Sequence, residues 1–257
     1  MAPDNSVGER LGALEASAQR LASLVNGLKL EQLDQQAYPS KWSVADVLSH
    51  IGSGAVIMRH GIDAAVSGDT VEDGFNQSVW AEWNAKGAAA RAADVLAADR
   101  ALLDRVASLT DAERDSLRFS IGPFQLDLAT FLELRLNEHA LHSWDVDVTF
   151  HPTATLAADA VPIVIDSLEM IAGFAGKSDG HERVLTVHTT EPSRAFAVNV
   201  RSERLALTAA ERSAPVDIEL PSEAFVRLVY GRLDPDHSPP DIESPELDQL
   251  RGLFPGV

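Results

Sequence analysis

Apolar residues recur at intervals of three and four positions along most of residues 8–148, a pattern that predicts amphipathic helices. The four expected helices cover residues 8–28, 43–66, 80–108 and 126–148. Ser43 and Asp46 are typical of a helix N-cap followed by an acid in the first turn, whereas Gly87 interrupts the third pattern. Four long helices with connections of moderate length predict a four-helix bundle.

Two signals mark a break between the third and fourth helices. Thr110-Asp111 and the pair Gly122-Pro123 are typical of chain turns. Residues 119–125 between them are expected to form a short extended or hairpin piece.

The pattern changes after residue 152. One more helix is expected over residues 156–175. Short runs with alternating or β-branched residues follow, as expected for strands, at 184–189, 195–200, 205–208 and 216–220. A helix then opens at Pro221 and ends at Gly231, and the proline-rich, acidic segment 234–245 is expected to be mostly irregular. We therefore expect a helical domain over residues 1–152 and a small α+β domain over residues 153–257.

Composition narrows the range of functions. Asp and Glu outnumber Lys and Arg by 39 to 21, giving a net charge of −18, which argues against nucleic acids and anionic membranes as partners. There is no cysteine, so a disulfide, a cysteine-ligated zinc site and a cysteine nucleophile are excluded. No signal peptide and no membrane-spanning apolar run is found, and a cytoplasmic protein is expected.

The fourth helix carries candidate metal ligands. Glu138 and His142 are four residues apart and therefore share one face of a helix, next to apolar residues. A carboxylate and an imidazole on such a face are costly unless something pairs with them, and a divalent metal would do so.

His50 is the best third candidate among the eight histidines. It lies at the edge of the inward stripe of the second helix, and Gly52 and Gly54 follow it, which would allow another group to come close. His139, although next to Glu138, points about 100° away from it around the helix. A His50/Glu138/His142 set would leave one or two metal positions open, as a catalytic site requires, and Asp145 would orient His142.

Ordinary explanations remain open for each residue alone. His50 could be a core-edge histidine bonded to a carbonyl group. Glu138 could pair with Arg135, and His142 with Asp145, each one turn away.

Three segments resemble a known family. Trp42-Ser-Val-Ala-Asp-Val-Leu-Ser-His50 resembles the Trp-x-x-x-(Asp/Glu)-x-x-x-His segment of the DinB-like bundles in mycothiol-dependent maleylpyruvate isomerases. Arg135-Leu-Asn-Glu138-His-Ala-Leu-His142-Ser-Trp-Asp145 is similar to that family's Arg-x-x-Glu-x-x-x-His-x-x-Asp helix, and Trp83-Asn84, expected to open the third helix, also fits. In the second domain, the helix ending at Gly231-Arg232 is similar to the family's Gly-Arg signature.

The resemblance implies a divalent metal, zinc or a similar ion, held by His50, Glu138 and His142. It implies mycothiol as a thiol cofactor or co-substrate that occupies the open metal position, and Arg232 as a catalytic residue that reaches the site and clamps a substrate carboxylate. The implied partners are thus a small-molecule thiol and an electrophilic substrate. The expected activity is S-transfer or maleylpyruvate-type cis-trans isomerisation.

Two other classes remain open. The same bundle could be a thiol-independent, metal-dependent hydrolase that uses a metal-bound water. It could also be a non-catalytic metal- or thiol-binding regulatory module. Turnover without added thiol would favour the first, and binding without turnover of any electrophile would favour the second.

Overall fold

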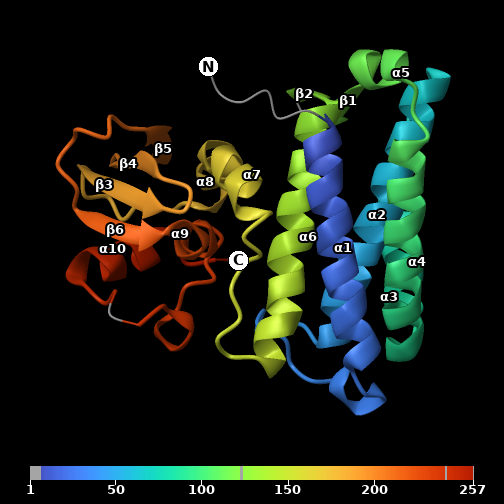
Figure 1. Ribbon diagram of the computed structural model, residues 1–257, viewed down its shortest axis with the longest axis horizontal. Helices are drawn as coiled ribbons and strands as arrows, with labels where there is room; N and C mark the ends of the chain where they lie inside the picture. Colours follow the sequence, from blue (N-terminus) through green and yellow to red (C-terminus); the bar gives the residue numbers. More distant parts are fainter. Residues whose placement is uncertain (1–6, 122–123, 241, 257) are drawn as a thin grey trace. The chain divides into compact units, whose positions relative to one another are not determined.

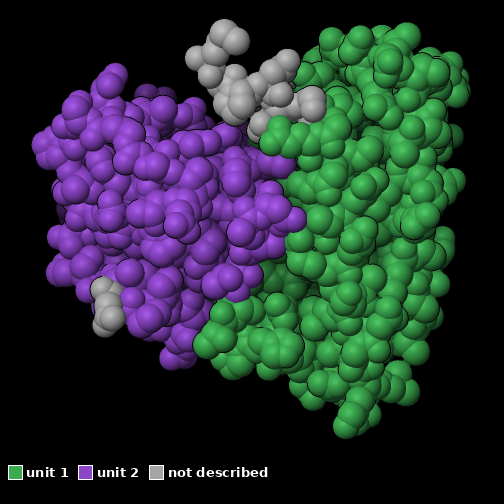
Figure 2. All heavy atoms as spheres, viewed as in Figure 1, with its two compact units in different colours: residues 1–154 green, residues 155–257 purple. Residues whose placement is uncertain are grey.

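The computed structural model describes residues 7–121, 124–240 and 242–256, so the expected break at Gly122-Pro123 lies outside the described residues. The chain divides into two compact units, residues 1–154 and 155–257 (Figure 1, Figure 2). Long helices dominate the first unit, and the second combines helices with a mixed sheet. The expected order, helices first and α+β second, is confirmed.

The long helices α1 (Val7–Gly27), α2 (Val44–Ser67), α4 (Ala88–Ala107) and α6 (Leu128–Phe150) of the first unit run beside one another (Figure 1). α2 packs against α4 and α6, and α1 packs against the same two helices. Their apolar faces form the core, in which Leu48, Val95 and Val146 are fully buried. The elements are α1 (Val7–Gly27), η1 (Leu30–Gln32), α2 (Val44–Ser67), α3 (Phe75–Ala85), α4 (Ala88–Ala107), α5 (Asp111–Ser116), β1 (Arg118–Ile121), β2 (Phe124–Asp127) and α6 (Leu128–Phe150).

The start of α2 is fixed by the predicted cap. The hydroxyl of Ser43 accepts a hydrogen bond from the Asp46 N–H at 3.1 Å, and the Asp46 carboxylate accepts one from the Ser43 N–H at 2.9 Å. This reciprocal capping box satisfies backbone donors that the first turn leaves unpaired. Arg91 of α4 also donates to Asp46, which ties the cap to a second helix.

The predicted third helix is wrong in its extent. The structure has two helices there, because Lys86 is extended and Gly87 becomes the N-cap of α4. Trp83 lies near the end of α3 rather than at the opening of a helix. Its indole fills the space beside Gly52 of α2, where a Cβ atom would overlap the ring. Gly52 thus allows the close approach that its position predicted, although the partner is Trp83.

The expected hairpin is present before α6. β1 and β2 pair in antiparallel register, with Phe119 opposite Leu126. Asp127 then caps α6, since its carboxylate accepts a hydrogen bond from the Thr130 N–H at 2.8 Å. The short helix α5, capped by Thr110, was not predicted.

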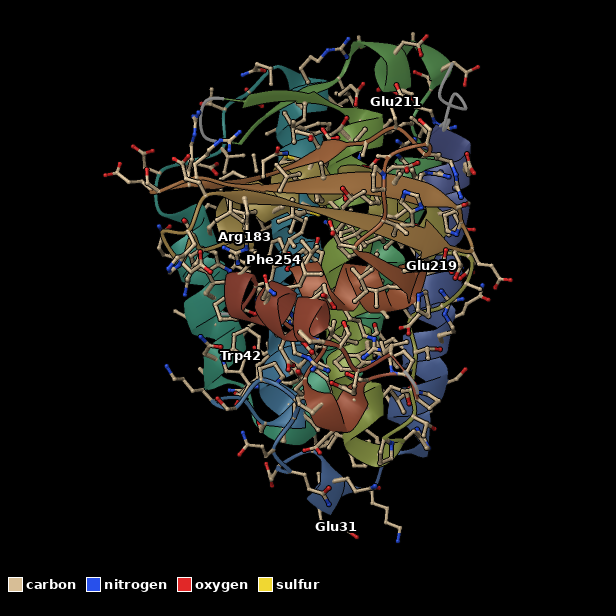
Figure 3. All side chains as sticks on the ribbon, turned by 90° about the vertical axis from the view of Figure 1, so that its left-hand side faces the viewer. Glu31, Trp42, Arg183, Glu211, Glu219 and Phe254 are labelled. Carbon is tan, nitrogen blue, oxygen red and sulfur yellow. The ribbon has the colours of Figure 1, made fainter. Side chains whose placement is uncertain are left out.

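The second unit is built on a four-stranded sheet in the order β5-β4-β3-β6. β3 is antiparallel to β4 and parallel to β6. α8 and α9 contact the sheet and each other, while acidic side chains such as Glu211 and Glu219 are exposed (Figure 3). The elements are α7 (Val161–Val164), η2 (Ile165–Ser167), α8 (Leu168–Ala175), β3 (Arg183–Thr190), β4 (Arg194–Val200), β5 (Leu205–Ala209), β6 (Ile218–Pro221), α9 (Ser222–Val229), η3 (Pro235–His237) and α10 (Pro245–Leu253).

Two expectations for this unit need correction. The helix predicted over 156–175 begins only at Val161 and contains the 3₁₀ turn η2, because Pro162 in its first turn lacks the N–H that a longer helix would need. The chain also ends in an unpredicted helix, α10, which buries Leu247, Leu250 and Leu253.

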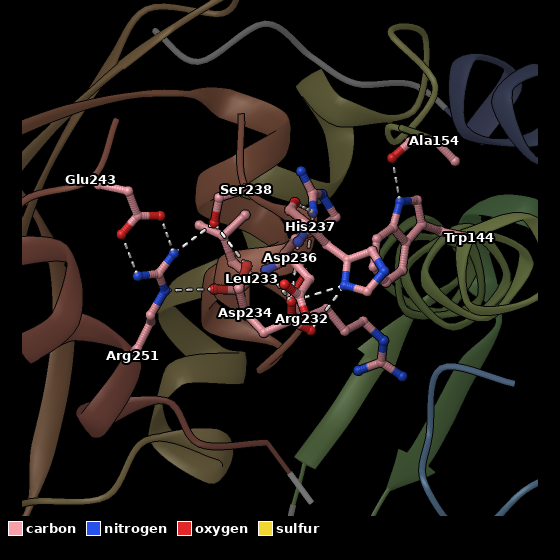
Figure 4. Close-up of polar contacts among 11 residues, drawn as sticks. Trp144, Ala154, Arg232, Leu233, Asp234, Asp236, His237, Ser238, Glu243 and Arg251 are labelled. Carbon is pink, nitrogen blue, oxygen red and sulfur yellow. Dashed lines mark hydrogen bonds and ion pairs between the residues drawn. The ribbon is translucent and has the colours of Figure 1, made fainter. Parts of the chain in front are cut away.

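The segment before α10 is fastened by Arg251. Its guanidinium donates to the carbonyl oxygen of Leu233 at 2.8 Å, to the hydroxyl of Ser238 at 2.6 Å and to both carboxylate oxygens of Glu243 at 2.9 Å (Figure 4). Irregular backbone is thereby held in place by one side chain. Within the described part of the chain, no helix has the length and apolar character needed to cross a membrane.

Candidate metal centre

Two packed helices bring the three candidate ligands together. Glu138 and His142 lie one turn apart on α6, and His50 comes from α2, which packs against α6. One potential ligand atom from each residue lies within 4.8 Å of the other two. We call this group the His/Glu/His centre.

The two imidazoles converge on one carboxylate oxygen. Oε2 of Glu138 lies 3.1 Å from Nε2 of His50 and 3.5 Å from Nε2 of His142. The ring centroids of the two histidines are 4.5 Å apart. The side chains of Glu138 and His50 are 51% and 40% exposed and that of His142 is 12% exposed, so the centre is accessible from solvent on the carboxylate side.

Glu138 is held in its ionised form. Partial burial opposes ionisation and alone would raise the pKa of the carboxyl group, but hydrogen bonds and charge interactions with His142 and His50 in their protonated form outweigh burial and hold the pKa well below its ordinary value. The considerable exposure of this side chain also weakens the opposing effect of burial. Glu138 therefore remains a carboxylate near neutral pH.

Asp145 fixes the orientation of His142. Nδ1–H of His142 donates to the carboxylate of Asp145 at 2.8 Å, and the Asp145 side chain is fully buried. With its proton on Nδ1, the neutral imidazole presents the lone pair of Nε2 to the centre. This arrangement was predicted for Asp145, and it is also the pairing expected if His142 has no part in metal binding.

Other ordinary explanations do not describe the centre. Arg135 donates to Asp99 at 2.7 Å and to the carbonyl oxygen of Ile51 at 2.9 Å, and no ion pair to Glu138 is found among the described contacts. The side chain of His50 is bonded to Glu138 rather than to a carbonyl group. His139, as predicted, points away, and its imidazole is bonded to Asp99 and Ser17 in the core.

Trp42 packs against both histidines of the centre, a contact that the sequence did not predict. Its ring centroid lies 5.2 Å from that of His50 and 5.8 Å from that of His142. The only signal was its place in the Trp-to-His segment, one residue before the N-cap of α2.

Asp99 was also missed. It lies four residues after Val95 and three before Leu102, all three buried, so a carboxylate at a core position of α4 was the available signal.

The remaining predicted or candidate residues lie elsewhere. Arg232 follows α9 in the second unit (Figure 4). Its guanidinium donates to the carbonyl oxygen of Tyr230 at 3.0 Å. This contact is the helix-end capping that such a residue provides without any catalytic role. Among the described residues, five other histidines do not belong to any group of three potential metal ligands: His60, His151, His181, His188 and His237.

The residues present fit a divalent cation. Two imidazole nitrogens and one carboxylate oxygen are an ordinary zinc donor set, and three protein ligands leave a further position open, as in catalytic zinc sites. Nε2 of His142 and Oε2 of Glu138 present lone pairs to the same space, an arrangement that is favourable only with a cation between or beside them. A proton or a metal ion would satisfy it.

Comparisons with known proteins find similar sequences and structures. A family model described as the mycothiol maleylpyruvate isomerase N-terminal domain matches residues 14–147, more than half of the chain. A crystal structure of the mycothiol-dependent maleylpyruvate isomerase matches with a TM-score of 0.66 and 13% identity, over 93% of this chain and 96% of that one. A histidine-to-alanine mutant of that enzyme matches with a TM-score of 0.65 and 12% identity, over 88% and 90% of the two chains. No curated protein matches the sequence.

Proposed function

The chain belongs to the family of the mycothiol maleylpyruvate isomerase N-terminal domain, and from this premise we propose that it is a metal-dependent enzyme that uses mycothiol against an electrophilic small molecule. The observation that carries the proposal is the convergence of His50, Glu138 and His142 within 4.8 Å. We assign residues 1–152 to a DinB-like four-helix bundle that holds the metal, and residues 153–257 to an α+β domain.

The two groups that the proposal adds would supply the reactive chemistry. A bound divalent ion, zinc or a similar metal, lowers the pKa of a thiol that binds it, and mycothiol brings the thiol that a chain without cysteine lacks. His50, Glu138 and His142 are the proposed metal ligands.

The chain's own residues orient the imidazoles of this centre and give it a negative charge. Glu138 contributes a negative charge that stays in place at low pH, because its pKa lies below the ordinary range. Asp145 keeps the proton of His142 on Nδ1, so that Nε2 presents its lone pair toward the centre. The exposure of Glu138 and His50 leaves a side of the centre open for a thiol and a substrate.

Arg232 is the proposed catalytic residue of the second domain. Its planar guanidinium suits a substrate carboxylate, which it can bind through two parallel hydrogen bonds. Support comes from its place in the Gly231-Arg232 pair, where Gly231 has a φ of 68° and lies so close to Gly256 that a Cβ atom would overlap that residue. Glycine is therefore needed at the position that sets the path of the chain into Arg232.

Two reactions share these residues. In a maleylpyruvate-type isomerisation the thiol is released unchanged, whereas in an S-transfer it remains attached to the product. We place the general S-transfer slightly ahead of the isomerisation, because the proposed ligands and Arg232 suit any electrophile that carries a carboxylate.

Metal analysis tests the centre. Purified wild-type protein should contain about one divalent ion per chain, as expected for one three-residue site. His142→Ala should lose the ion, while His151→Ala, at the exposed end of the same helix, should retain it. Circular dichroism checks that both variants are folded. A wild-type protein that remains metal-free under non-chelating conditions would contradict the proposed site.

A panel of electrophiles, with and without mycothiol, tests the chemistry. Mass spectrometry should find either S-conjugates or isomerised substrate, and only when mycothiol and metal are both present. Turnover without any thiol would instead favour a metal-dependent hydrolase. Metal-dependent binding of mycothiol without turnover of any electrophile would favour a non-catalytic binding module.

A further inference from the structure

Trp42 forms an aromatic cluster with the two histidines of the centre. Its indole is nearly parallel to the ring of His142, at an interplanar angle of 28°, and is tilted by 44° against the ring of His50. The two imidazoles meet each other edge to face, at 68°. One half-buried indole therefore limits the rotation of both proposed imidazole ligands.

Backbone hydrogen bonds fix the main chain of Trp42 independently of the centre. The N–H of Trp42 donates to the carbonyl oxygen of Pro39 at 3.0 Å, and its own carbonyl oxygen accepts from the N–H of Ala37 at 3.0 Å. The following residue, Ser43, is the N-cap of α2 and is locked in the capping box with Asp46. Trp42 is thus held on both sides by local structure before any ligand binds.

A preformed aromatic wall favours the metal-loaded centre for two reasons. The His50 and Glu138 side chains are substantially exposed, and an exposed side chain loses rotamer freedom when it binds a metal. A wall that already restricts the rings reduces that loss. Metal binding also draws electron density from an imidazole, and the electron-rich face of an indole stabilises a ring that has become more positive.

We propose that Trp42 is a positioning residue of the His/Glu/His centre, whose indole holds His50 and His142 in ligand geometry and raises the affinity of the centre for a divalent metal. The inference rests on the proposed function, because it concerns the same site. It adds a residue that touches the ligands without binding the metal.

The competing explanation is that Trp42 only covers the hydrophobic core, against which it also packs. Three variants separate the two roles. Trp42→Leu keeps an apolar side chain but removes the aromatic face. Trp42→Phe keeps an aromatic face of smaller area, and Trp42→Ala removes both.

Zinc affinity, measured by competition with a chromophoric chelator, is the first readout. We expect Trp42→Leu and Trp42→Ala to bind zinc about tenfold more weakly than wild type, within the range found when groups around metal ligands are removed. Trp42→Phe should recover most of the affinity. Chemical denaturation of the metal-free proteins reports stability separately, so a variant that is merely less stable is recognised.

Tryptophan emission during a zinc titration is the second readout. Wild type should show a zinc-dependent change that is absent from Trp42→Phe. The control is Trp80→Phe, which removes an indole that is 45% exposed on α3 and should leave the change intact. This readout does not depend on catalytic activity.

The outcomes separate the inference from the function on which it rests. A wild-type protein without zinc affinity contradicts both. If wild type binds zinc, equal zinc affinity in wild type and Trp42→Leu contradicts only the positioning role of Trp42. An emission change that persists in Trp42→Phe contradicts contact between Trp42 and the loaded centre.

Discussion

At the scale of single residues, Asp145 shows how a buried carboxylate selects the nitrogen that a histidine presents. Replacing it by Asn removes the negative charge beside Nδ1 of His142 and allows the other tautomer. We expect Asp145→Asn to weaken metal binding by about 10- to 100-fold. Asp147→Asn is the matched control, since Asp147 lies on the same helix and its carboxylate pairs with the exposed His151. Chelator competition measures both, and equal affinities would contradict the orienting role.

Glu138 determines how the centre should respond to acid. Because its two histidine partners hold its pKa below the ordinary range, the carboxylate does not take up a proton when the pH falls from 7.5 to 5.5. Protons therefore compete with the metal only at the imidazoles. At a pH at which an imidazole is protonated in the metal-free protein, that proton must leave before the metal binds, and each unit by which the pH falls weakens metal binding by about tenfold for that imidazole.

Metal affinity should therefore fall as the pH falls, with a limiting slope of about two log units per pH unit for two imidazole ligands. Chelator competition at a series of pH values measures the slope. Glu138→Gln should bind the metal more weakly but reach the same limiting slope. A slope that changes in this variant would show that Glu138 itself takes up a proton in this range.

How far single residues could be predicted depended on whether their partners are close in sequence. Glu138, His142 and Asp145 lie within eight residues, so helix periodicity alone places them on related faces. His50 required the packing of α2 on α6, which the resemblance supplied. The contact of Trp42 with both imidazoles depends on the backbone path before α2, and no periodic pattern describes that path.

At the scale of elements, a buried polar network joins the helices behind the centre. Asp99 of α4 accepts hydrogen bonds from Arg135 of α6 and contacts His139 of the same helix, and His139 reaches Ser17 of α1. Burial lowers the pKa of His139, and this effect prevails over the carboxylate of Asp99, which acts in the opposite direction. Arg135 thus carries the positive charge that pairs with Asp99.

The lowered pKa of His139 has a definite consequence for stability. In the unfolded chain an imidazole takes up its proton near pH 6.5, but in the folded protein it does so only at lower pH. The contribution to stability is complete above about pH 6.5 and is lost as the pH falls toward the folded pKa.

Urea unfolding of the metal-free protein at pH 7.5 and 5.5 should show this loss. The loss of stability between pH 7.5 and 5.5 should be smaller in His139→Gln than in wild type. It should be unchanged in His151→Gln, because the side chain of His151 is 65% exposed. An identical loss in wild type and His139→Gln would contradict the assignment.

Gly52 and Gly61 provide a matched pair on α2. A Cβ atom at Gly52 would overlap the indole of Trp83, which is 97% buried and cannot easily move, whereas nothing lies within 4 Å of the Cβ position at Gly61. We expect Gly52→Ala to destabilise the protein by about 1–3 kcal/mol through overpacking. Gly61→Ala should stabilise it by about 0.5–1 kcal/mol, because alanine favours a helix. Chemical denaturation measures both, and similar effects would show that α3 does not pack on α2 as described.

Elements with regular patterns and strong caps could be predicted, and those set by backbone breaks could not. Ser43 and Gly68 mark both ends of α2, and its predicted extent agrees with the structure. The separation of α3 from α4 depends on one extended residue, Lys86, inside a sequence that remains rich in helix formers. The prolines of segment 234–245 indicated mostly irregular structure, which the described residues before α10 confirm apart from the turn η3. Pro245 lies in the first turn of α10, where a missing N–H costs nothing.

At the scale of the whole molecule, the proposed function uses two units of different construction. All three proposed metal ligands and their neighbours Trp42 and Asp145 belong to residues 1–154, whereas Arg232 belongs to residues 155–257. Metal binding should therefore stabilise the first unit. Hydrogen exchange followed by mass spectrometry distinguishes the two units, because amide protection is resolved along the sequence.

Hydrogen exchange with and without ligands tests whether Arg232 takes part. Zinc alone should slow exchange in α2 and α6 and leave the sheet strands unchanged, since the proposed ligands lie on those two helices. Adding mycothiol and a carboxylate-bearing electrophile should slow exchange further around residues 230–234, if Arg232 binds the substrate. Protection confined to the first unit under all conditions would contradict a catalytic role for Arg232.

Substitution of Arg232 completes this test. Arg232→Lys keeps the positive charge but removes the planar fork, so turnover should fall by at least tenfold while zinc affinity stays unchanged. Arg251→Lys is the control, because Arg251 belongs to the same unit and fastens the chain through Leu233, Ser238 and Glu243. It should lower stability more than turnover. If Arg232→Lys loses only stability, its bond to the carbonyl oxygen of Tyr230 explains the residue as a helix cap, and catalysis must depend on the first unit alone.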